Sequence, residues 1–236
     1  MSNLYLFPLS DLHLGSSQCD LEFFDVWRRE FEKAPDNKAI YCLGDLLEFP
    51  RASLDAYGVT MSTHDALERL IELLEPYKEY VQYVCTGNHE ARTLKEHNYD
   101  ITRTIAERLD AKYTRSDFFS KIISDDEREF IVYGKHGTRI SKNPQLNMNN
   151  FIRDMSDIDA NLYMRGHNHY CEFASNYRRG YDDGDRRYYA FTGHFLGYDG
   201  YARNKGLPMS QPSFMRLKID KNLHVDCKKY YKDEVM

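Results

Sequence analysis

Residues 160–169 read ANLYMRGHNH, in which a short apolar run ends at Gly166 and is followed by two histidines one residue apart. In extended backbone, residues i and i+2 point to the same side, so His167 and His169 could bind one partner together. Two exposed polar residues near a turn are the alternative, and one pair does not separate these readings. The question is therefore whether other strands of the chain end in the same way.

Four more apolar runs do end in this way. Their polar ends are Asp11-Leu12-His13, Asp45, Asn88-His89-Glu90 and His136. Because ligands bind at the carboxyl ends of strands in open α/β sheets, we expect these groups to meet at one rim. Each group alone is common at a turn, but their joint occurrence favours a metal centre. Oxygen and imidazole ligands together suit Mn²⁺, Fe or Zn²⁺, and their number fits two ions that share a carboxylate.

The spacing of apolar residues predicts an α/β protein. In the first half, strands at 3–10, 38–45 and 79–88 alternate with helices at 20–34, 64–78 and 100–111, where Ser62 and Asp65 form a capping box before the second helix. The second half is mostly strands, at 117–124, 128–137, 160–169, 171–179, 186–195, 213–220 and 223–231, with one helix at 149–158. Alternation predicts parallel pairing and hairpins predict antiparallel pairing, so a layered sandwich with two mixed sheets accommodates both halves.

Length and composition fit one globular domain over residues 1–236, with 42% hydrophobic residues. The formal net charge of −5 argues against a strongly basic nucleic-acid-binding surface. Five scattered cysteines without a CxxC pair argue against a disulfide framework or a zinc-thiolate site. No apolar run is long enough for a membrane span and the N-terminus lacks signal-peptide features, so we expect a cytoplasmic protein that does not contact a membrane.

The blocks DLH, GD, GNHE, KHG and GHNH, in this order between residues 11 and 169, resemble the five-block signature of the calcineurin-like metallophosphoesterases. The resemblance implies a four-layer αββα sandwich and two divalent metal ions, with Mn²⁺ as first choice and Fe or Zn²⁺ as alternatives. It implies that Asp45 bridges the ions and that His89 acts beside the scissile group without binding metal. By the same resemblance, one ion is bound by Asp11, His13 and His169, and the other by Asn88, His136 and His167.

Around this core set, four residues are candidates for supporting or substrate-contacting roles. Glu90 is expected to orient His89 or to anchor its loop. His194 is expected either to support the ligands at the edge of the site or to be purely structural. Two positive ions and two aspartates leave a local positive surplus that attracts a phosphate oxyanion. Arg51 and Arg92 are candidates for binding the phosphate.

The substrate is less determined than the chemistry. Protein serine/threonine phosphatases resemble the chain at GNHE, but their second block, GDxVDRG, contrasts with GDLLEFPR here, where Glu48 and Phe49 replace Asp and Arg. Lipid A pyrophosphohydrolases resemble it at SDLHLG but have arginine in place of His89. We therefore expect a phosphodiesterase acting on nucleotides or nucleic acid, with a phosphomonoesterase as the alternative.

Two further features leave their readings open. The tyrosine- and arginine-bearing segment 177–203 could stack bases, or it could pack on the sheet or in a dimer contact, so the oligomeric state is not readable. The irregular segment 197–212 could be functional or a packed surface loop. Some members of the superfamily, such as the retromer subunit, are scaffolds that lost ligands, but here every ligand position is filled.

Overall fold

A computed structural model describes residues 2–49, 58–138, 141, 143–177, 186–197 and 210–236, and all structural statements concern these residues. The first half of the chain contains β1 (Leu4–Leu9), α1 (Leu21–Lys33), β2 (Lys38–Cys42), α2 (Thr63–Leu74), the 3-10 helix η2 (Glu75–Tyr80), β3 (Val81–Cys85), α3 (Glu90–His97), α4 (Ile101–Arg108) and β4 (Lys112–Thr114). The second half contains β5 (Asp117–Ile123), β6 (Glu129–Lys135), α5 (Pro144–Asp154), β7 (Leu162–Arg165), β8 (Cys171–Tyr177), β9 (Arg186–His194), β10 (Ser213–Ile219), β11 (Val225–Tyr231) and α7 (Lys232–Val235).

The strands form two mixed sheets, as the sequence predicts. In the first, β4, β3, β2 and β1 are parallel neighbours, and β10 and β11 continue it in antiparallel fashion. In the second, β6, β7 and β9 are parallel, while β5 and β8 pair antiparallel at its two sides. A short ladder between β9 and β10, at Gly193–Phe214 and His194–Ser213, joins the two sheets.

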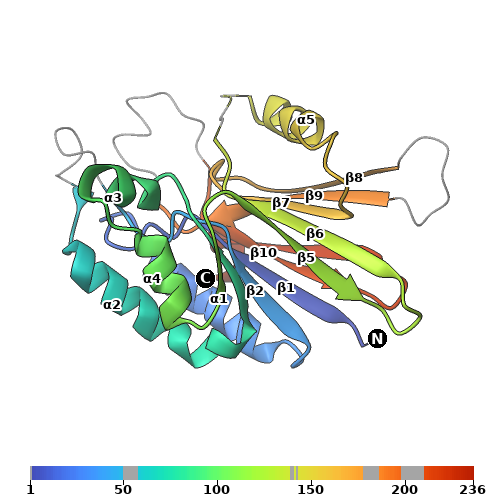
Figure 1. Ribbon diagram of the computed structural model, residues 1–236, viewed down its shortest axis with the longest axis horizontal. Coiled ribbons are helices and arrows are strands. Elements are labelled where there is room, and N and C mark those ends of the chain that lie inside the picture. The colour runs from blue at the N-terminus through green and yellow to red at the C-terminus, as the bar shows by residue number, and fades with distance from the viewer. Residues whose placement is uncertain (1, 50–57, 139–140, 142, 178–185, 198–209) are drawn as a thin grey trace.

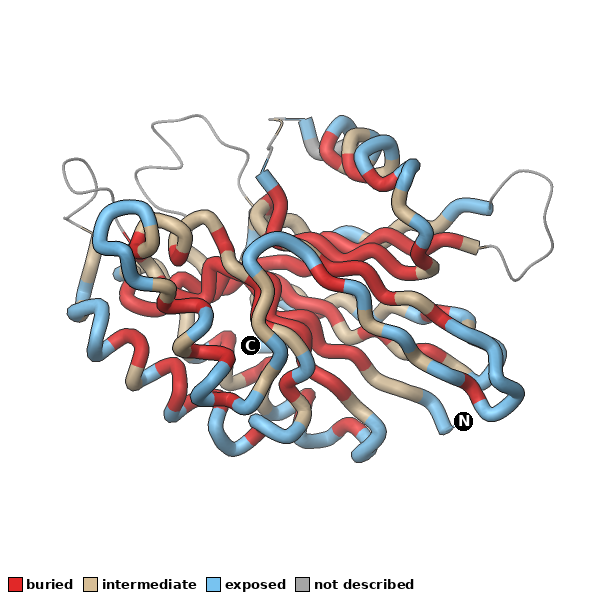
Figure 2. The backbone as a smooth tube through the Cα atoms, in the orientation of Figure 1, coloured by how far each residue is buried: buried red, intermediate tan, exposed pale blue. Residues whose placement is uncertain are grey.

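The helices and sheets are stacked in four layers (Figure 1), and three apolar clusters lie between them. One cluster packs α1, α2 and α4 against the first sheet, one contains strand residues of both sheets, and one packs α5 against the second sheet. Successive residues of β1 serve different clusters, since Phe7 faces the helices and Leu6 faces the other sheet. Figure 2 shows buried residues concentrated along the central strands. The αββα sandwich is thus confirmed.

The predicted helices form with small differences in their ends. The Ser62 side chain accepts from the backbone N–H of Asp65, which confirms the predicted cap of α2. Helix α5 begins five residues before the predicted 149, and α3 and β4 were not predicted. No described helix is long and apolar enough to cross a membrane.

The topology brings the predicted polar groups to one edge. The loops that follow β1, β2 and β3 leave the first sheet, and those that follow β6 and β7 leave the second. Because the two sheets stack face to face, their strand ends meet above the central cluster. The candidate ligands therefore converge from segments more than 150 residues apart, as the contact between His167 and Asp11 shows.

Candidate metal centre

The backbone of the candidate ligands is unusual. Positive φ angles between 49° and 71° occur at Asp11, His13, Asp45, His167 and His169. L-residues rarely adopt this left-handed region, and such conformations gather at functional sites where the surrounding structure fixes them. Five of the nine non-glycine residues with positive φ in the described chain are therefore candidate ligands.

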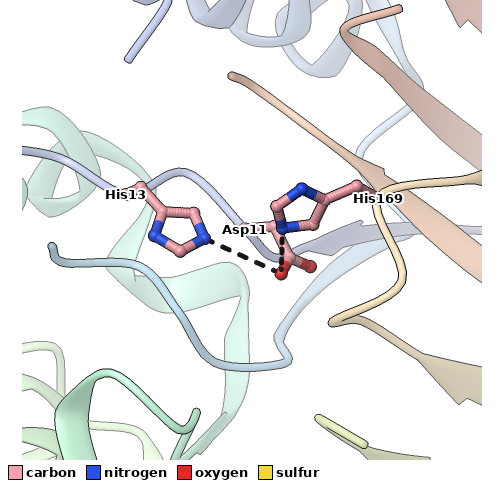
Figure 3. Close-up of side chains that lie close together, drawn as sticks. All are labelled: Asp11, His13 and His169. Carbon is pink, nitrogen blue, oxygen red and sulfur yellow. Dashed lines mark ion pairs between the residues drawn. The ribbon is translucent and has the colours of Figure 1, made fainter. Parts of the chain in front are cut away.

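The first cluster contains Asp11, His13 and His169 (Figure 3). The Nε2 atoms of His169 and His13 lie 3.3 and 4.0 Å from Oδ1 of Asp11. Both Asp11 Oδ1 and His13 Nε2 are buried and have no hydrogen-bond partner among the described residues. Orphaned buried polar atoms are costly, so this pair fits a cation between them.

The second cluster gathers around His136. Its Nδ1 lies 2.7 Å from the carbonyl oxygen of Leu43, so Nδ1 donates and Nε2 faces the site. Within 3.1 Å of that Nε2 lie Asp45 Oδ2, Asn88 Oδ1 and His167 Nδ1. One ring nitrogen cannot satisfy three such atoms, since it carries at most one proton. The donor set again fits a cation, and Asp45 Oδ2, 3.8 Å from His13 Nε2, connects the two clusters.

Without a metal ion, protons hold this cluster together. Burial would raise the pKa of Asp45, but His136 and its other imidazole neighbours hold it well below its ordinary value. Burial would likewise lower the pKa of His136, yet the Asp45 carboxylate raises it to about 9. Burial and His136 together lower the pKa of His167 to about 4. In the metal-free protein the buried carboxylate of Asp45 is therefore balanced by a proton on His136.

His89 lies beside the clusters, and its ring forms no hydrogen bond with a candidate metal ligand in the described chain. Its Nδ1 is 2.9 Å from Glu48 Oε1, and the other oxygen of Glu48 is 2.8 Å from Nδ1 of His13. Burial would raise the pKa of Glu48, but its bonds to His13 and His89 lower it to about 2. One ionised carboxylate therefore orients two imidazoles, and each turns its Nε2 away from Glu48.

The guanidinium of Arg92 contacts the ring of His89. Its two terminal nitrogens lie 3.3 Å from Nδ1 and 3.0 Å from Nε2 of His89, and it also donates to the carbonyl oxygen of Phe49. No carboxylate in the described chain lies within ion-pair distance of Arg92, so its charge is available to an anion. The other arginine candidate, Arg51, lies outside the described residues.

Glu90 anchors the loop and does not orient His89. Its carboxylate accepts from the backbone N–H groups of Asp45, Leu47 and Gly87 at 2.9–3.0 Å. Burial and the nearby Asp45 raise its pKa to about 7. The three bonds tie the end of β3 to the end of β2, so one of the two predicted roles of Glu90 is supported and Glu48 takes the other.

His194 packs against a candidate ligand, as expected for the edge of the site. Its ring stacks on His169 with centroids 5.0 Å apart, and burial together with His169 lowers its pKa to about 3. Its Nδ1 accepts from the backbone N–H of Leu196, and Nε2 lies 3.0 Å from Ser210 Oγ. Most of segment 197–212 lies outside the described residues.

Three residues that support the candidate site, Glu48, Ser10 and Thr192, were not predicted from the sequence. Glu48 appeared only as a departure from GDxVDRG, although it stands where that block has an aspartate, and this was the available signal. Ser10 contacts Asp11, and Thr192 contacts Ser10; this pair carries no sequence signal because its two members are 182 residues apart in the chain.

The geometry agrees with the comparisons to known proteins. Vacuolar protein sorting 29 from Cryptosporidium parvum shares 14% identity at a TM-score of 0.50, with 98% of this chain and 100% of that chain covered. A single mutant of Vps29 from Entamoeba histolytica gives 14% and 0.50 over 97% and 99% of the two chains. A candidate 5′-nucleotidase from Staphylococcus aureus gives 10% and 0.52 over 98% of this chain and 54% of its own.

These likenesses show the fold alone, and no curated protein matches the sequence. The family model for calcineurin-like phosphoesterases matches residues 9–203, which include all five blocks and every candidate ligand described above. The chain therefore belongs to the calcineurin-like phosphoesterase family.

Proposed function

We propose that the protein is a phosphoester hydrolase with two divalent metal ions, Mn²⁺ being the first choice. The observation that carries the proposal is the convergence of two donor clusters. In the first, Asp11 Oδ1 and His13 Nε2 are buried without a partner among the described residues, and in the second a single imidazole nitrogen, Nε2 of His136, meets three ligand-type atoms. One ion would be held by Asp11, His13 and His169 and the other by Asn88, His136 and His167, with Asp45 between them. When bound, the ions supply positive charge that activates a water molecule and neutralises the phosphoryl oxygens.

His89 is the proposed proton donor to the leaving oxygen. Glu48 holds Nδ1 and leaves Nε2 to act. In the substrate-free arrangement Arg92 donates to that Nε2, because a guanidinium cannot accept. A phosphoryl oxygen offers Arg92 a stronger, charge-assisted hydrogen bond. Substrate binding would thus move Arg92 to the phosphate and free Nε2 of His89, which accepts a hydrogen bond in the substrate-free arrangement and therefore takes up a proton from solvent before it donates one to the leaving oxygen.

For the substrate, we propose a phosphodiester of a nucleotide or nucleic acid. Support comes from Tyr177, whose exposed ring lies 5.1 Å from the guanidinium of Arg186, an arrangement suited to a base and its phosphate. The two residues pair at the far end of the β8–β9 ladder. His194 is eight residues from Arg186 along β9, about 26 Å in a strand. Only a polymer could reach both places.

This distance makes the substrate testable. We would measure Mn²⁺-dependent hydrolysis of a simple monoester and diester, cyclic nucleotides, single- and double-stranded DNA, RNA and a phosphopeptide. The expected result is diester preference, with Tyr177→Ala and Arg186→Ala slowing oligonucleotide hydrolysis and leaving the small diester unchanged. Preference for the phosphopeptide or the monoester would overturn the phosphodiesterase proposal.

Metal analysis separates an enzyme from a scaffold of the same fold. Protein stripped with a chelator and then dialysed against Mn²⁺ should retain two ions per chain by elemental analysis. Asp45→Asn should retain fewer, because it removes the carboxylate shared by both clusters. A wild-type protein that retains no ion would contradict the hydrolase proposal.

A further inference from the structure

Two buried hydroxyl groups lie behind Asp11, on the side away from the imidazoles. Ser10 Oγ is 2.6 Å from Asp11 Oδ2, and Thr192 Oγ1 is 2.7 Å from Ser10 Oγ. Both residues are 2% exposed and Asp11 is fully buried. Ser10 follows β1 and Thr192 belongs to β9, so the contact joins the two sheets beneath the metal centre.

The direction of these hydrogen bonds follows from proton counting. An ionised carboxylate only accepts, so Ser10 donates its single proton to Asp11. The contact between Ser10 and Thr192 then needs the proton of Thr192. The carbonyl oxygen of Arg165, at 3.3 Å, is the more distant acceptor for Thr192. The chain of donation therefore runs from Thr192 to Ser10 to Asp11.

This chain determines which carboxylate oxygen faces the site. Asp11 Oδ2 also accepts from the backbone N–H of His167 at 2.9 Å, so two donors occupy it. Oδ1 has no hydrogen-bond partner in the described chain and points toward the ring nitrogens of His13 and His169. The carboxylate cannot turn Oδ2 away without leaving the hydroxyl of Ser10 and the backbone N–H of His167 without their buried acceptor.

The end of β9 supports the same ligands in two other ways. His194 stacks on His169, and the backbone N–H of Phe195 donates to the carbonyl oxygen of Asp11 at 3.0 Å. Gly193, with a φ of +89°, has no room for a Cβ because Ser213 O would lie 2.0 Å away. The segment Thr192–Phe195 is thus built closely against the metal centre.

We propose that Ser10 and Thr192 are positioning residues that hold the Asp11 carboxylate so that Oδ1 is reserved for a metal ion. The inference rests on the proposed metal centre. Partners that orient a ligating carboxylate typically change metal affinity by about 10–100-fold when removed. The two hydroxyls act in series, so losing either one should have much of the effect of losing both.

The test measures Mn²⁺ affinity by titration calorimetry on chelator-stripped protein, with no substrate present. We expect Ser10→Ala and Thr192→Val to weaken the affinity by about 10-fold or more. The double variant should bind Mn²⁺ about as weakly as Ser10→Ala alone. The two losses of binding free energy should therefore not add. Thr192→Ser, which keeps the hydroxyl, should bind nearly as the wild type does.

Thr102→Val is the matched control. Thr102 is 1% exposed in α4, and its hydroxyl has no hydrogen-bond partner among the residues the structure describes. It should change the melting temperature without changing Mn²⁺ affinity. Thermal melting of each variant checks folding, and Thr192→Ser decides the question if Thr192→Val does not fold.

The outcomes separate the two proposals. Wild-type protein that binds no Mn²⁺ would overturn both the hydrolase and the positioning role. Wild-type binding with unchanged Thr192→Val or Ser10→Ala would overturn the positioning role alone. Equal weakening by Thr192→Ser and Thr192→Val would also overturn it, because packing and not the hydroxyl would then be responsible.

Discussion

Glu48 illustrates how a single side chain connects the two chemical parts of the site. Its two oxygens bind Nδ1 of His13, a candidate ligand, and Nδ1 of His89, the candidate proton donor. Hydrogen bonds to a carboxylate determine the tautomer of an imidazole and the orientation of its ring. Both histidines therefore present Nε2 to the reaction from one fixed anchor.

The variant His89→Ala should keep Mn²⁺ binding and lose roughly 10²–10⁴-fold in turnover, as when a general acid is removed. The ring makes no bond to the predicted metal ligands, so their geometry should persist. Calorimetry would measure the metal and a diester assay the turnover. The control is His97→Ala, which changes an exposed histidine at the end of α3, the helix that His89 precedes. Unchanged turnover in His89→Ala would remove it from the mechanism.

Glu48→Gln should impair both functions at once. A glutamine oxygen can accept from one Nδ1–H, while its amide group presents a donor to the other. We expect Mn²⁺ affinity to fall by about 10–100-fold and turnover of the metal-saturated protein to fall as well. The control is Glu72→Gln, whose side chain forms an exposed pair with Arg69. A loss of turnover with unchanged metal affinity would show that the contact with His13 is dispensable.

Among the elements, apolar periodicity predicted the strands and the longer helices and failed where polar contacts decide. Helix α3 reads EARTLKEH, and its buried residues are Glu90 and Thr93. Its first residue is fixed by three backbone donors from neighbouring loops, a tertiary effect that a local pattern does not contain. The three-residue β4 is likewise defined only by its pairing with β3.

The candidate site divides in the same way. The ligand types were readable because each follows an apolar strand, and topology then brings strand ends together. The supporting contacts were not readable, since Glu48 meets His13 and His89, which are 35 and 41 residues away, and Ser10 meets Thr192, which is 182 residues away. The pairings of Glu48 depend on how the loops after neighbouring strands meet, and the pairing of Ser10 with Thr192 depends on how the two sheets meet.

The loop contacts between elements lead to a prediction for Gly87. A Cβ there would lie 2.1 Å from the backbone nitrogen of Asp45 and 2.2 Å from its Oδ1. Gly87→Ala should therefore displace the loop after β2, destabilise the fold by about 1–3 kcal/mol or more, and weaken metal binding. Denaturant unfolding and calorimetry would measure the two effects. Gly58→Ala, for which no atom of the described residues comes closer than 3.9 Å to the new Cβ, should change neither.

For the molecule as a whole, the metal-free site links folding to pH. The pKa of His136 is about 9 in the folded protein against 6.5 ordinarily. Between these values the folded state binds a proton that the unfolded state lacks, so stability falls as pH rises. The lowered pKa values of Asp45 and Glu48 change the free energy of unfolding only at acidic pH. His167, with its pKa near 4, is neutral in both the folded and the unfolded state above about pH 7.

Metal binding should reverse this dependence, because a ligating imidazole must be deprotonated. We expect the melting temperature of chelator-treated protein to fall between pH 6.5 and 8.5, while the gain from saturating Mn²⁺ grows over the same range. A concentration of 100 times Kd stabilises by about 2.7 kcal/mol, or roughly 5–11 °C for a chain of this size. Thermal scans with Mn²⁺ and with chelator at each pH would measure it. His136→Asn, which cannot titrate, should lose the pH slope of the metal-free protein above about pH 7.5, where Glu90, with its pKa near 7, is mostly ionised in both states. An unchanged slope in that range would mean that another group holds the proton.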